Sequence, residues 1–529
     1  MSRINTNVSS QIAQRILSGN SKTLNTTLER LSTGLRVNRG KDDPAGLIAS
    51  ENLRGEKTAL GAAISNAERT DQLANIAEGG LQEISNLLTD LQGLLTQTAN
   101  NAGLSAEEKS ANQLQIDSIL QTVDRIADST NFQGVKLLNG NFDFRSSSVA
   151  TGVQDFRVNG AKVTKGGSIK VQALITQSAQ QAALFLSTGT NLNLGGATGL
   201  FAIEVGGGLG SRELSFASGT SQTNIIAAIN TFSDVTGVKA VATTSGAATT
   251  IGLQSTTFGS ASFVSVKVVN DPGATGVGVG IYRSRNSTAT DAGFVDAEQA
   301  STAQGVTTFG STAAKNGLRQ NGQDVAATIN GVAATADGKT ARINTDFLDV
   351  EINFDKATAT AVGSVGGAGG SFTITGGGAE FQLAGRVDIA GKVALGIQNV
   401  ASRRLGAIDL SATATPSISY LSDLGAGKTL NIVNGDITGA QKVVTEAIRQ
   451  VSSLRGRLGA FQKNTVGATI RSLNISLENT TAAESVVRDA DFASETASLT
   501  RGQILAQAST NVLALANQQP QQVLQLLRG

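Results

Sequence analysis

A run of apolar residues between positions 74 and 95 constrains the fold of this chain more than any other feature of its sequence. The apolar positions alternate at spacings of three and four residues: Ala74, Ala77, Leu81, Ile84, Leu88, Leu91 and Leu95. Such an a/d stripe lies along one side of a helix and needs a helical partner to cover it. The sequence therefore predicts a long helix packed against at least one other.

Similar stripes run through the rest of the first 140 residues. The apolar positions are Ile4, Val8, Ile12 and Ile16, and then Leu24, Leu28, Leu31 and Leu35. Asp43 before Pro44 is typical of an N-cap with proline at the first helical position, and Ser105 with Glu108 forms a capping-box pattern. Residues 1–140 are therefore predicted to form several long helices.

The C-terminal stretch from about residue 436 has the same pattern of apolar stripes at helical spacing. One stripe contains Ala447, Val451, Leu454, Leu458 and Phe461, and another contains Leu505, Ala508, Val512 and Leu515. Antiparallel packing of the two ends of the chain would bury both stripes. The predicted helical core seam consists of Leu81, Ile84, Leu88, Leu91, Leu95, Val451, Leu454 and Leu458.

Between the ends, residues 141–435 are rich in glycine, serine, threonine, alanine and valine, with short alternating runs that predict β-strands. Residues 223–232 instead predict one short helix. We expect an α+β module at about 200–270 and a β-rich module at about 320–400. In the latter, DVAATINGV and FLDVEINF are predicted to pair as a hairpin across ADGKT. The fold class is thus α+β and multidomain: long, paired, coiled-coil-like terminal helices enclose a β-rich central insertion.

The composition argues against most catalytic and metal-binding chemistry. The chain contains no Cys, His or Trp, so it cannot form a disulfide, use an imidazole base or bind metal through Cys or His. SDLGAGKT at 422–429 resembles a phosphate-binding loop, but Ser422 replaces the first glycine. We predict no enzyme activity, no cofactor and no metal.

Charge and hydropathy give no sign of a nucleic-acid or membrane partner. The formal net charge is +1, and no run of 18 apolar residues is present. The N-terminus also lacks the apolar region of a cleavable secretory signal. We therefore expect neither nucleic acid nor membrane as a partner.

The apolar stripes at the extreme ends of the chain lie far from any predicted core. Isolated helices of this kind are marginal in water, so packing against copies of the same chain would supply the missing burial. Contacts of this type propagate into a helical filament. The predicted intersubunit residues are Ile4, Val8, Ile12, Ile16, Leu24, Leu28, Leu31, Leu35, Leu505, Ala508, Val512, Leu515, Val523 and Leu526.

Four motifs carry a close resemblance to bacterial flagellin: LSTGLRVNRGKDDPAGL (31–47), NFQGVKLLNG (131–140), RGRLGAFQ (455–462) and the stretch from RDADFASETASLTRGQ to ANQQPQQVLQLLR (488–528). The resemblance implies the subunit of the extracellular flagellar filament, with termini that become ordered on polymerisation. It also implies export without a cleavable signal peptide, and partnership with an export chaperone and with junction and cap proteins.

On this basis three parts are expected. Residues 1–42 with 490–529 would form terminal assembly helices that line an inner tube, 43–140 with 417–489 a helical core domain, and 141–416 a variable exposed insertion. In flagellins recognised by the flagellin-sensing Toll-like receptor, two arginines and a glutamate stand at the positions of Asp90, Gln92 and Gly93. This altered region predicts weak or absent recognition.

Three alternatives to a filament subunit arise from the sequence and from the resemblance. A hook-filament junction protein shares similar terminal helices, and the β-rich insertion is also compatible with an adhesion module on the filament surface. Some flagellins carry a zinc protease in the insertion, but the absence of histidine excludes that chemistry here. The length and the match through the C-terminal motif favour the filament subunit.

Overall fold

The computed structural model describes residues 6–100, 103–163, 167–196, 198–245, 248–276, 279–283, 307–410 and 418–526. The α-helices are α1 (Val8–Thr33), α2 (Pro44–Thr98), α3 (Ala106–Ser129), α4 (Gln222–Thr231), α5 (Ser233–Thr236), α6 (Thr312–Asn316), α7 (Lys356–Ala359), α8 (Ile437–Ala460), α9 (Gly467–Arg488) and α10 (Phe492–Leu526). Two short 3₁₀-helices, η3 (Gly367–Gly369) and η4 (Leu421–Leu424), and a π-helical segment, η5 (Phe461–Val466), complete the helical elements.

The chain divides into two compact units. The first comprises Met1–Glu78, Phe381–Val393 and Arg455–Gly529, and the second comprises Gly79–Glu380 and Ala394–Leu454. Long helices at both ends with strands between them confirm the predicted fold class.

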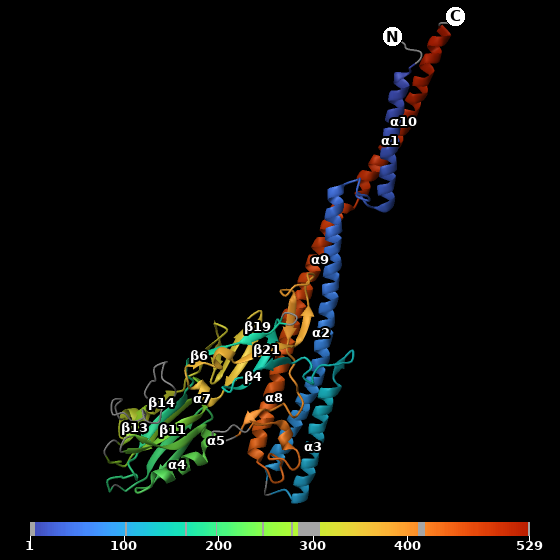
Figure 1. The fold of residues 1–529 in the computed structure, drawn as a ribbon. Coiled ribbons are helices and arrows are strands. Elements are labelled where there is room, and N and C mark those ends of the chain that lie inside the picture. The colour runs from blue at the N-terminus through green and yellow to red at the C-terminus, as the bar shows by residue number, and fades with distance from the viewer. Residues whose placement is uncertain are drawn as a thin grey trace. The chain divides into compact units, whose positions relative to one another are not determined.

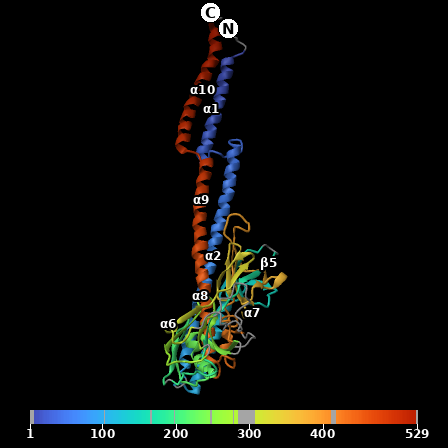
Figure 2. The ribbon, with the colours of Figure 1, turned by 90° about the vertical axis from the view of Figure 1, so that its left-hand side faces the viewer.

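The first unit consists mainly of two helix pairs. α1 lies beside α10, and α9 lies beside the first part of α2, in both Figure 1 and Figure 2. An ion pair between Lys57 Nζ and Glu484 Oε2 at 3.2 Å joins α2 to α9. The start of α2 is as predicted, because Asp43 Oδ1 accepts a 2.9 Å hydrogen bond from the backbone N–H of Gly46.

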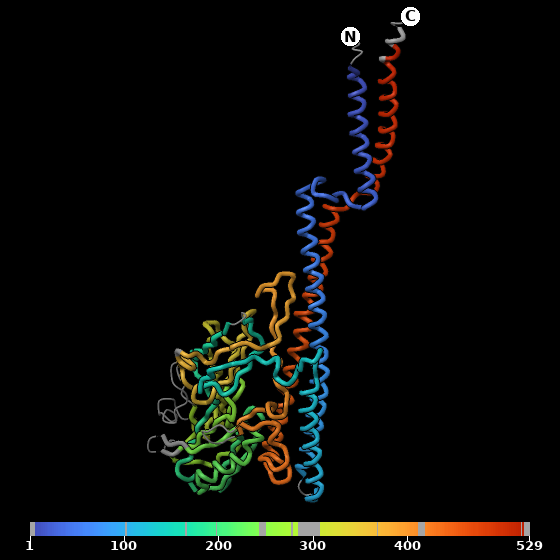
Figure 3. The backbone as a smooth tube through the Cα atoms, turned by 45° about the vertical axis from the view of Figure 1, so that its right-hand side comes forward, coloured from blue at the N-terminus to red at the C-terminus, as the bar shows by residue number. Residues whose placement is uncertain are grey.

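A hairpin of β22 (Ala379–Gln382) and β23 (Lys392–Leu395) contributes its outer part to the first unit. It is the orange loop beside the helices in Figure 3. The Phe381 ring lies 5.9 Å from the Phe461 ring at the start of η5. Gln462 in η5 donates a 2.9 Å hydrogen bond to Asn75 Oδ1 on α2, so the π-helical turn is held by its neighbours.

The helical part of the second unit is organised around α3. Its predicted capping box is present, with Ser105 and Glu108 bonding each other's backbone N–H groups. Gln113 joins α3 to η4 and to the loop after it: its Nε2 donates to Leu424 O at 2.9 Å, and its Oε1 accepts from Ile432 N at 2.9 Å. Asp117 Oδ1 accepts from Ala426 N at 3.0 Å, so the phosphate-loop-like segment is a turn fastened to α3.

One β-module of the second unit is a pair of four-stranded sheets with α4 packed against them. One sheet has the order β10 (Val238–Ser245), β11 (Ala248–Phe258), β7 (Gln181–Ser187) and β13 (Gly280–Arg283). The other has the order β14 (Leu318–Asn321), β12 (Phe263–Asn270), β8 (Phe201–Gly207) and β9 (Ser211–Phe216). A single apolar cluster joins both sheets to Ile225 and Ile229 of α4, the helix predicted at 223–232.

The other β-module contains three sheets around a second apolar cluster. The first sheet has the order β16 (Val332–Ala333), β15 (Ala326–Ile329), β6 (Ala173–Gln177) and β20 (Gly363–Ser364). The second has the order β17 (Thr335–Asp337), β18 (Thr340–Asn344), β19 (Leu348–Phe354) and β4 (Val153–Ala161). The third has the order β3 (Phe144–Ser147), β21 (Phe372–Gly377) and β5 (Ile169–Val171). Two minor pairs are β1 (Asn131–Phe132) with β2 (Val135–Lys136), and β24 (Ile408–Asp409) with β25 (Ile418–Ser419).

The predicted pairing of DVAATINGV with FLDVEINF across ADGKT is wrong. Asn330 and Gly331 both have positive φ, 50° and 82°, and turn the chain between β15 and β16. Such an Asn-Gly pair favours a two-residue hairpin turn, so the first strand ends early. ADGKT instead connects β17 to β18, and β19 pairs with β18 and β4.

Candidate assembly surface

Small residues line the contact between α1 and α10. The buried positions on α1 include Ser10, Ala13 and Thr27. On α10, Gly502, Ser509 and Ala516 are buried and stand seven residues apart. We call these six residues, with Asn20, the small-residue seam. A Cβ added at Gly502 would lie 3.4 Å from Leu24 Cδ1, which shows how closely the helices approach.

Hydrogen bonds fix the antiparallel register of this pair. Asn7 Nδ2 donates to Ala516 O at 2.8 Å while its Oδ1 caps α1 by accepting from Ser10 N at 3.0 Å. Ser10 Oγ donates to Asn517 Oδ1 at 2.7 Å, and Asn20 Nδ2 donates to Ser509 Oγ at 2.7 Å. Polar groups at a helix interface specify register because a shifted pairing leaves them unsatisfied.

An ion pair closes the other end of the same contact. Arg30 Nη1 lies 3.1 Å from Glu495 Oε1, and the Glu495 side chain is only 13% exposed. Arg30 is in the last turn of α1 and Glu495 is in the first turn of α10. Each charge therefore also suits the dipole of the helix that carries it.

The connection between α1 and α2 is tied to the one between α9 and α10. Gly34 ends α1 with a left-handed φ of 71°, and its carbonyl accepts from Ala490 N at 2.9 Å. Arg36 N donates to Arg488 O at 2.7 Å, and the Arg36 guanidinium donates to Val487 O at 2.7 Å. Hydrogen bonds between these two connections thus join the two helix pairs of the first unit.

Large apolar side chains of α1 and α10 point away from the seam. Beyond the first turn of α10, where Phe492 is also exposed, eight of them are between 44% and 64% exposed: Val8, Ile12, Ile16, Leu28, Ile504, Leu505, Val512 and Leu515. We call this set the apolar outer face. Seven of the eight belong to the predicted intersubunit set, and Ile504 was missed.

The other predicted intersubunit residues lie as follows. Leu24, Leu31 and Leu35 are half-buried, and Ala508 is exposed. Ile4 lies outside the described residues. Val523 and Leu526 belong to α10, but their side chains lie outside the described part.

The predicted helical core seam is buried within the chain. Leu81, Ile84, Leu88, Leu91, Leu95, Val451, Leu454 and Leu458 are all at most 3% exposed. On α2, which carries Leu81 to Leu95, Asp90 and Gly93 are exposed and Gln92 is half-buried. Gln92 and Gly93 line a shallow groove with Thr89, Thr96, Gln97 and Asn100.

Sequence reasoning missed the small-residue seam because it searched for large apolar residues. The usable signal was the seven-residue spacing of Ala13, Asn20 and Thr27 on one helix and of Gly502, Ser509 and Ala516 on the other. A heptad repeat of small residues allows close helix approach without a wide apolar stripe.

The described residues give no sign of a metal site or of a membrane-spanning helix. No group of three or more His, Cys, Asp or Glu side chains in that part of the chain could hold a metal ion. None of the described helices has a stretch long and apolar enough to cross a bilayer.

Comparison with known proteins identifies both ends of the chain. The bacterial flagellin N-terminal helical region matches residues 4–143, and the bacterial flagellin C-terminal helical region matches residues 441–527. These are the regions that carry α1 to α3 and α8 to α10.

Full-length relatives match as well. The B-type flagellin of Pseudomonas aeruginosa is 30% identical over 549 residues, and the flagellin of Salmonella typhimurium is 30% identical over 539 residues. Each match covers 99% of this chain and 99% of the relative. Among solved structures, FliC from Burkholderia pseudomallei matches at 15% identity over 74% of this chain and 99% of its own, with a TM-score of 0.25, too low to add to the assignment.

Flagellins are structural subunits of the flagellar filament and not enzymes, which agrees with the absence of histidine and cysteine from this chain. The full-length matches, together with the two terminal regions, show that this chain belongs to the bacterial flagellin family.

Proposed function

We propose that the apolar outer face of α1 and α10 is the surface through which this flagellin polymerises. The observation that carries the proposal is the difference in composition between the inner and outer faces of the helix pair. Small and polar residues hold α1 to α10, while eight large apolar side chains remain exposed to water. Fully burying one such side chain contributes about 1.5–3 kcal/mol, so their joint burial between subunits would be a strong driving force.

The same difference between the two faces suggests how folding and assembly are coupled. A helix pair with few large side chains in its own contact gains little from pairing alone, and ordering its residues costs conformational entropy. Contacts with neighbouring subunits would offset that cost. In this proposal the terminal helices, 1–42 with 490–529, form the inner tube, residues 43–140 with 417–489 form the helical core, and 141–416 form the exposed insertion.

Partners other than the chain itself follow from the same surface. An export chaperone would cover the apolar outer face before assembly, and junction and cap proteins would present matching helices at the two ends of the filament. Export without a cleavable signal peptide, which the resemblance to flagellin implies, belongs to the same proposal.

Seeded elongation tests the proposal. Ile12→Gln and Val512→Gln should each raise the critical concentration for growth from filament fragments, because glutamine is costly to bury without a partner. The matched control is Leu209→Gln, since Leu209 is a 71% exposed leucine in a β-module of the second unit. Equal elongation by all three variants would count against the proposed surface. A chain lacking residues 1–40 and 490–529 should remain a folded monomer.

A further inference from the structure

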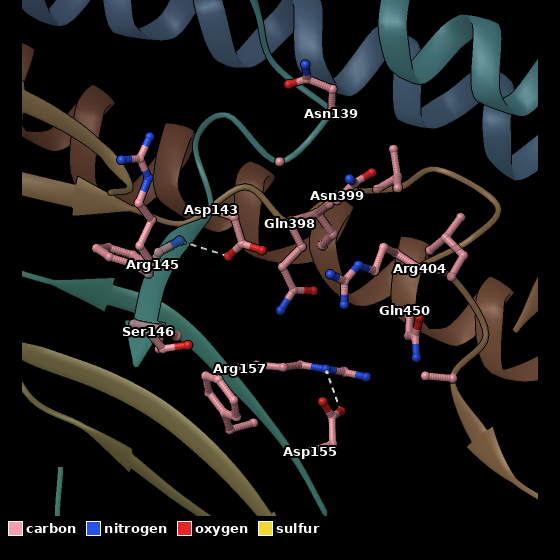
Figure 4. Close-up of a pocket in the computed structure, with 18 of the residues that line it drawn as sticks. Asn139, Asp143, Arg145, Ser146, Asp155, Arg157, Gln398, Asn399, Arg404 and Gln450 are labelled. Atoms are coloured by element: carbon pink, nitrogen blue, oxygen red, sulfur yellow. Dashed lines mark hydrogen bonds and ion pairs between the residues drawn. The ribbon is translucent and has the colours of Figure 1, made fainter. Parts of the chain in front are cut away.

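A polar cavity in the second unit is lined by residues that do not belong to the assembly surface. It has a volume of about 470 Å³ and is lined by side chains from β3, β4, α8 and the loop around residues 398–407. Cavities of this size hold small ligands. Figure 4 shows the guanidinium groups of Arg157 and Arg404 and the amide of Gln398 directed into the same space.

Arg157 is the most unusual residue of this cavity. Its side chain is only 17% exposed, and its guanidinium makes no hydrogen bond to any residue that the structure describes. Its nearest carboxylate oxygens are Asp155 Oδ2 at 3.8 Å and Glu446 Oε1 at 3.6 Å. At these distances both carboxylates form ion pairs with the guanidinium but no hydrogen bond, so its N–H groups remain available to a ligand.

The nearby acidic groups are poor substitutes for a ligand. Glu446 is engaged by Arg449 at 2.6 Å and 2.8 Å and by Gln450 at 2.9 Å. Burial raises the pKa of Asp155, since charging that carboxyl is unfavourable there, despite the Arg157 charge that opposes the shift.

Arg404 supplies the second cation. Its guanidinium makes no hydrogen bond or ion pair with the described residues, and neither does the Gln398 side chain. Arg157 makes only the two ion pairs at 3.6 Å and 3.8 Å, and Arg404 makes none with the described residues, so the N–H groups of both guanidiniums are open to a ligand. A bound oxyanion would accept hydrogen bonds from both.

We propose that this cavity binds a small oxyanion, held between Arg157 and Arg404 with Gln398 as an additional donor. The shared chemistry is a carboxylate, phosphate or sulfate group, and it can come from a free inorganic ion or from a carboxylated sugar. This assigns a ligand-binding role to residues outside the apolar outer face.

Calorimetric titration of the full-length protein tests the site with four probes: inorganic phosphate, sulfate, D-glucuronate and neutral glucose. Saturable binding of at least one anion and not of glucose is expected. Tighter binding of glucuronate would assign the carboxylated sugar, and tighter binding of phosphate or sulfate would assign the free ion. No saturable anion binding, or equal binding of glucose, would overturn the proposal.

Variants locate the site. Arg157→Gln and Arg404→Gln should each weaken anion binding at least tenfold, because each removes a charge-assisted contact. Arg145→Gln is the matched control, since Arg145 lines the same cavity but its guanidinium lies well away from the other two in Figure 4. Arg404 is exposed, so its variant keeps the test valid even if Arg157→Gln misfolds.

Seeded elongation separates this site from the assembly surface. Arg404→Gln should elongate normally while losing the anion. Equal affinities of the Arg145 and Arg404 variants would contradict the placement. A polymerisation defect in Arg404→Gln, without anion binding by the parent, would indicate a subunit contact instead and overturn the proposal.

Discussion

Asn20 on α1 and Ser509 on α10 are joined by a 2.7 Å hydrogen bond between Asn20 Nδ2 and Ser509 Oγ. Asn20 also lies 3.4 Å from the carbonyl oxygen of Leu505. Ser509 is itself buried and donates to Leu505 O one turn earlier at 2.6 Å. One asparagine therefore connects to both the side chain and the backbone of the partner helix.

Removing this asparagine should weaken the terminal helix pair. Asn20→Ala loses the bond to Ser509, a loss of about 1 kcal/mol, and should raise the critical concentration for seeded elongation roughly fivefold. Asn25→Ala is the control, because Asn25 is exposed on the same helix and has no side-chain bond to the described residues. Identical critical concentrations for the two variants would show that the bond does not contribute to assembly.

Two adjacent glycines of α2 should respond oppositely to alanine. A Cβ at Gly79 meets nothing within 4 Å, so Gly79→Ala should stabilise the helix by up to about 1 kcal/mol. A Cβ at Gly80 would lie 2.7 Å from Thr130 Oγ1 and 2.9 Å from Leu138 Cδ1. Gly80→Ala should therefore destabilise by roughly 1–3 kcal/mol. Scanning calorimetry of both variants beside the parent checks the sign, and a stabilising Gly80→Ala would contradict the packing.

Glu446 should make the second unit sensitive to acid. Burial acts to raise the pKa of Glu446, but the hydrogen bonds and charge of Arg449, with Gln450 and Arg157, outweigh it and leave the pKa below its usual value. A carboxyl with a lowered folded pKa stabilises the fold above its unfolded pKa, and this stability is lost as pH falls through the folded pKa.

Glu446→Gln should therefore destabilise the protein near pH 7 by roughly 1–3 kcal/mol, with little difference from the parent below the folded pKa. Calorimetry across this range measures the difference directly. Glu213→Gln is the control, because Glu213 is exposed on β9. A Glu446→Gln deficit that is as large in strong acid as at neutral pH would argue against the linkage.

The residues at positions 90, 92 and 93 predict how the flagellin-sensing Toll-like receptor recognises this chain. Purified monomer should activate Toll-like-receptor reporter cells weakly or not at all, since the acidic Asp90 and the neutral Gln92 stand where recognised flagellins carry arginine. A variant combining Asp90→Arg, Gln92→Arg and Gly93→Glu should gain activity. Robust activation by the parent at nanomolar dose would refute the expectation.

Local sequence signals predicted the local features of the fold. The caps at Asp43 and Ser105 depend on residues three positions apart, and both are present. The heptad stripe from Leu81 to Leu95 is buried along its length because its period matches the helix. The β-rich insertion was recognisable from composition.

Strand partners were not predictable in the same way. β7 is buried at six consecutive positions and so lacks the alternation that marks a half-exposed strand. It pairs with β11 and β13, which are distant in sequence. The Asn330-Gly331 turn ended a strand that the alternating pattern would have continued.

The candidate surface was only partly predictable for a related reason. A sequence stripe shows which residues share a helix face but not whether that face meets its own chain or another. The Leu81–Leu95 stripe turned inward and the Ile12–Ile16 stripe outward, although both have helical periodicity. The small-residue seam explains the difference, because it occupies the contact that the larger residues would otherwise fill.

The bonded register of α1 and α10 also has a mechanical consequence. Because the small residues repeat every seven positions, the next register with the same packing lies one heptad away, a slide of roughly 10 Å at 1.5 Å per residue. Reaching it requires the Asn7, Ser10 and Asn20 bonds and the Arg30–Glu495 pair to break together. Under axial load, the two helices of such a pair do not slide gradually past each other but shift only by a whole heptad.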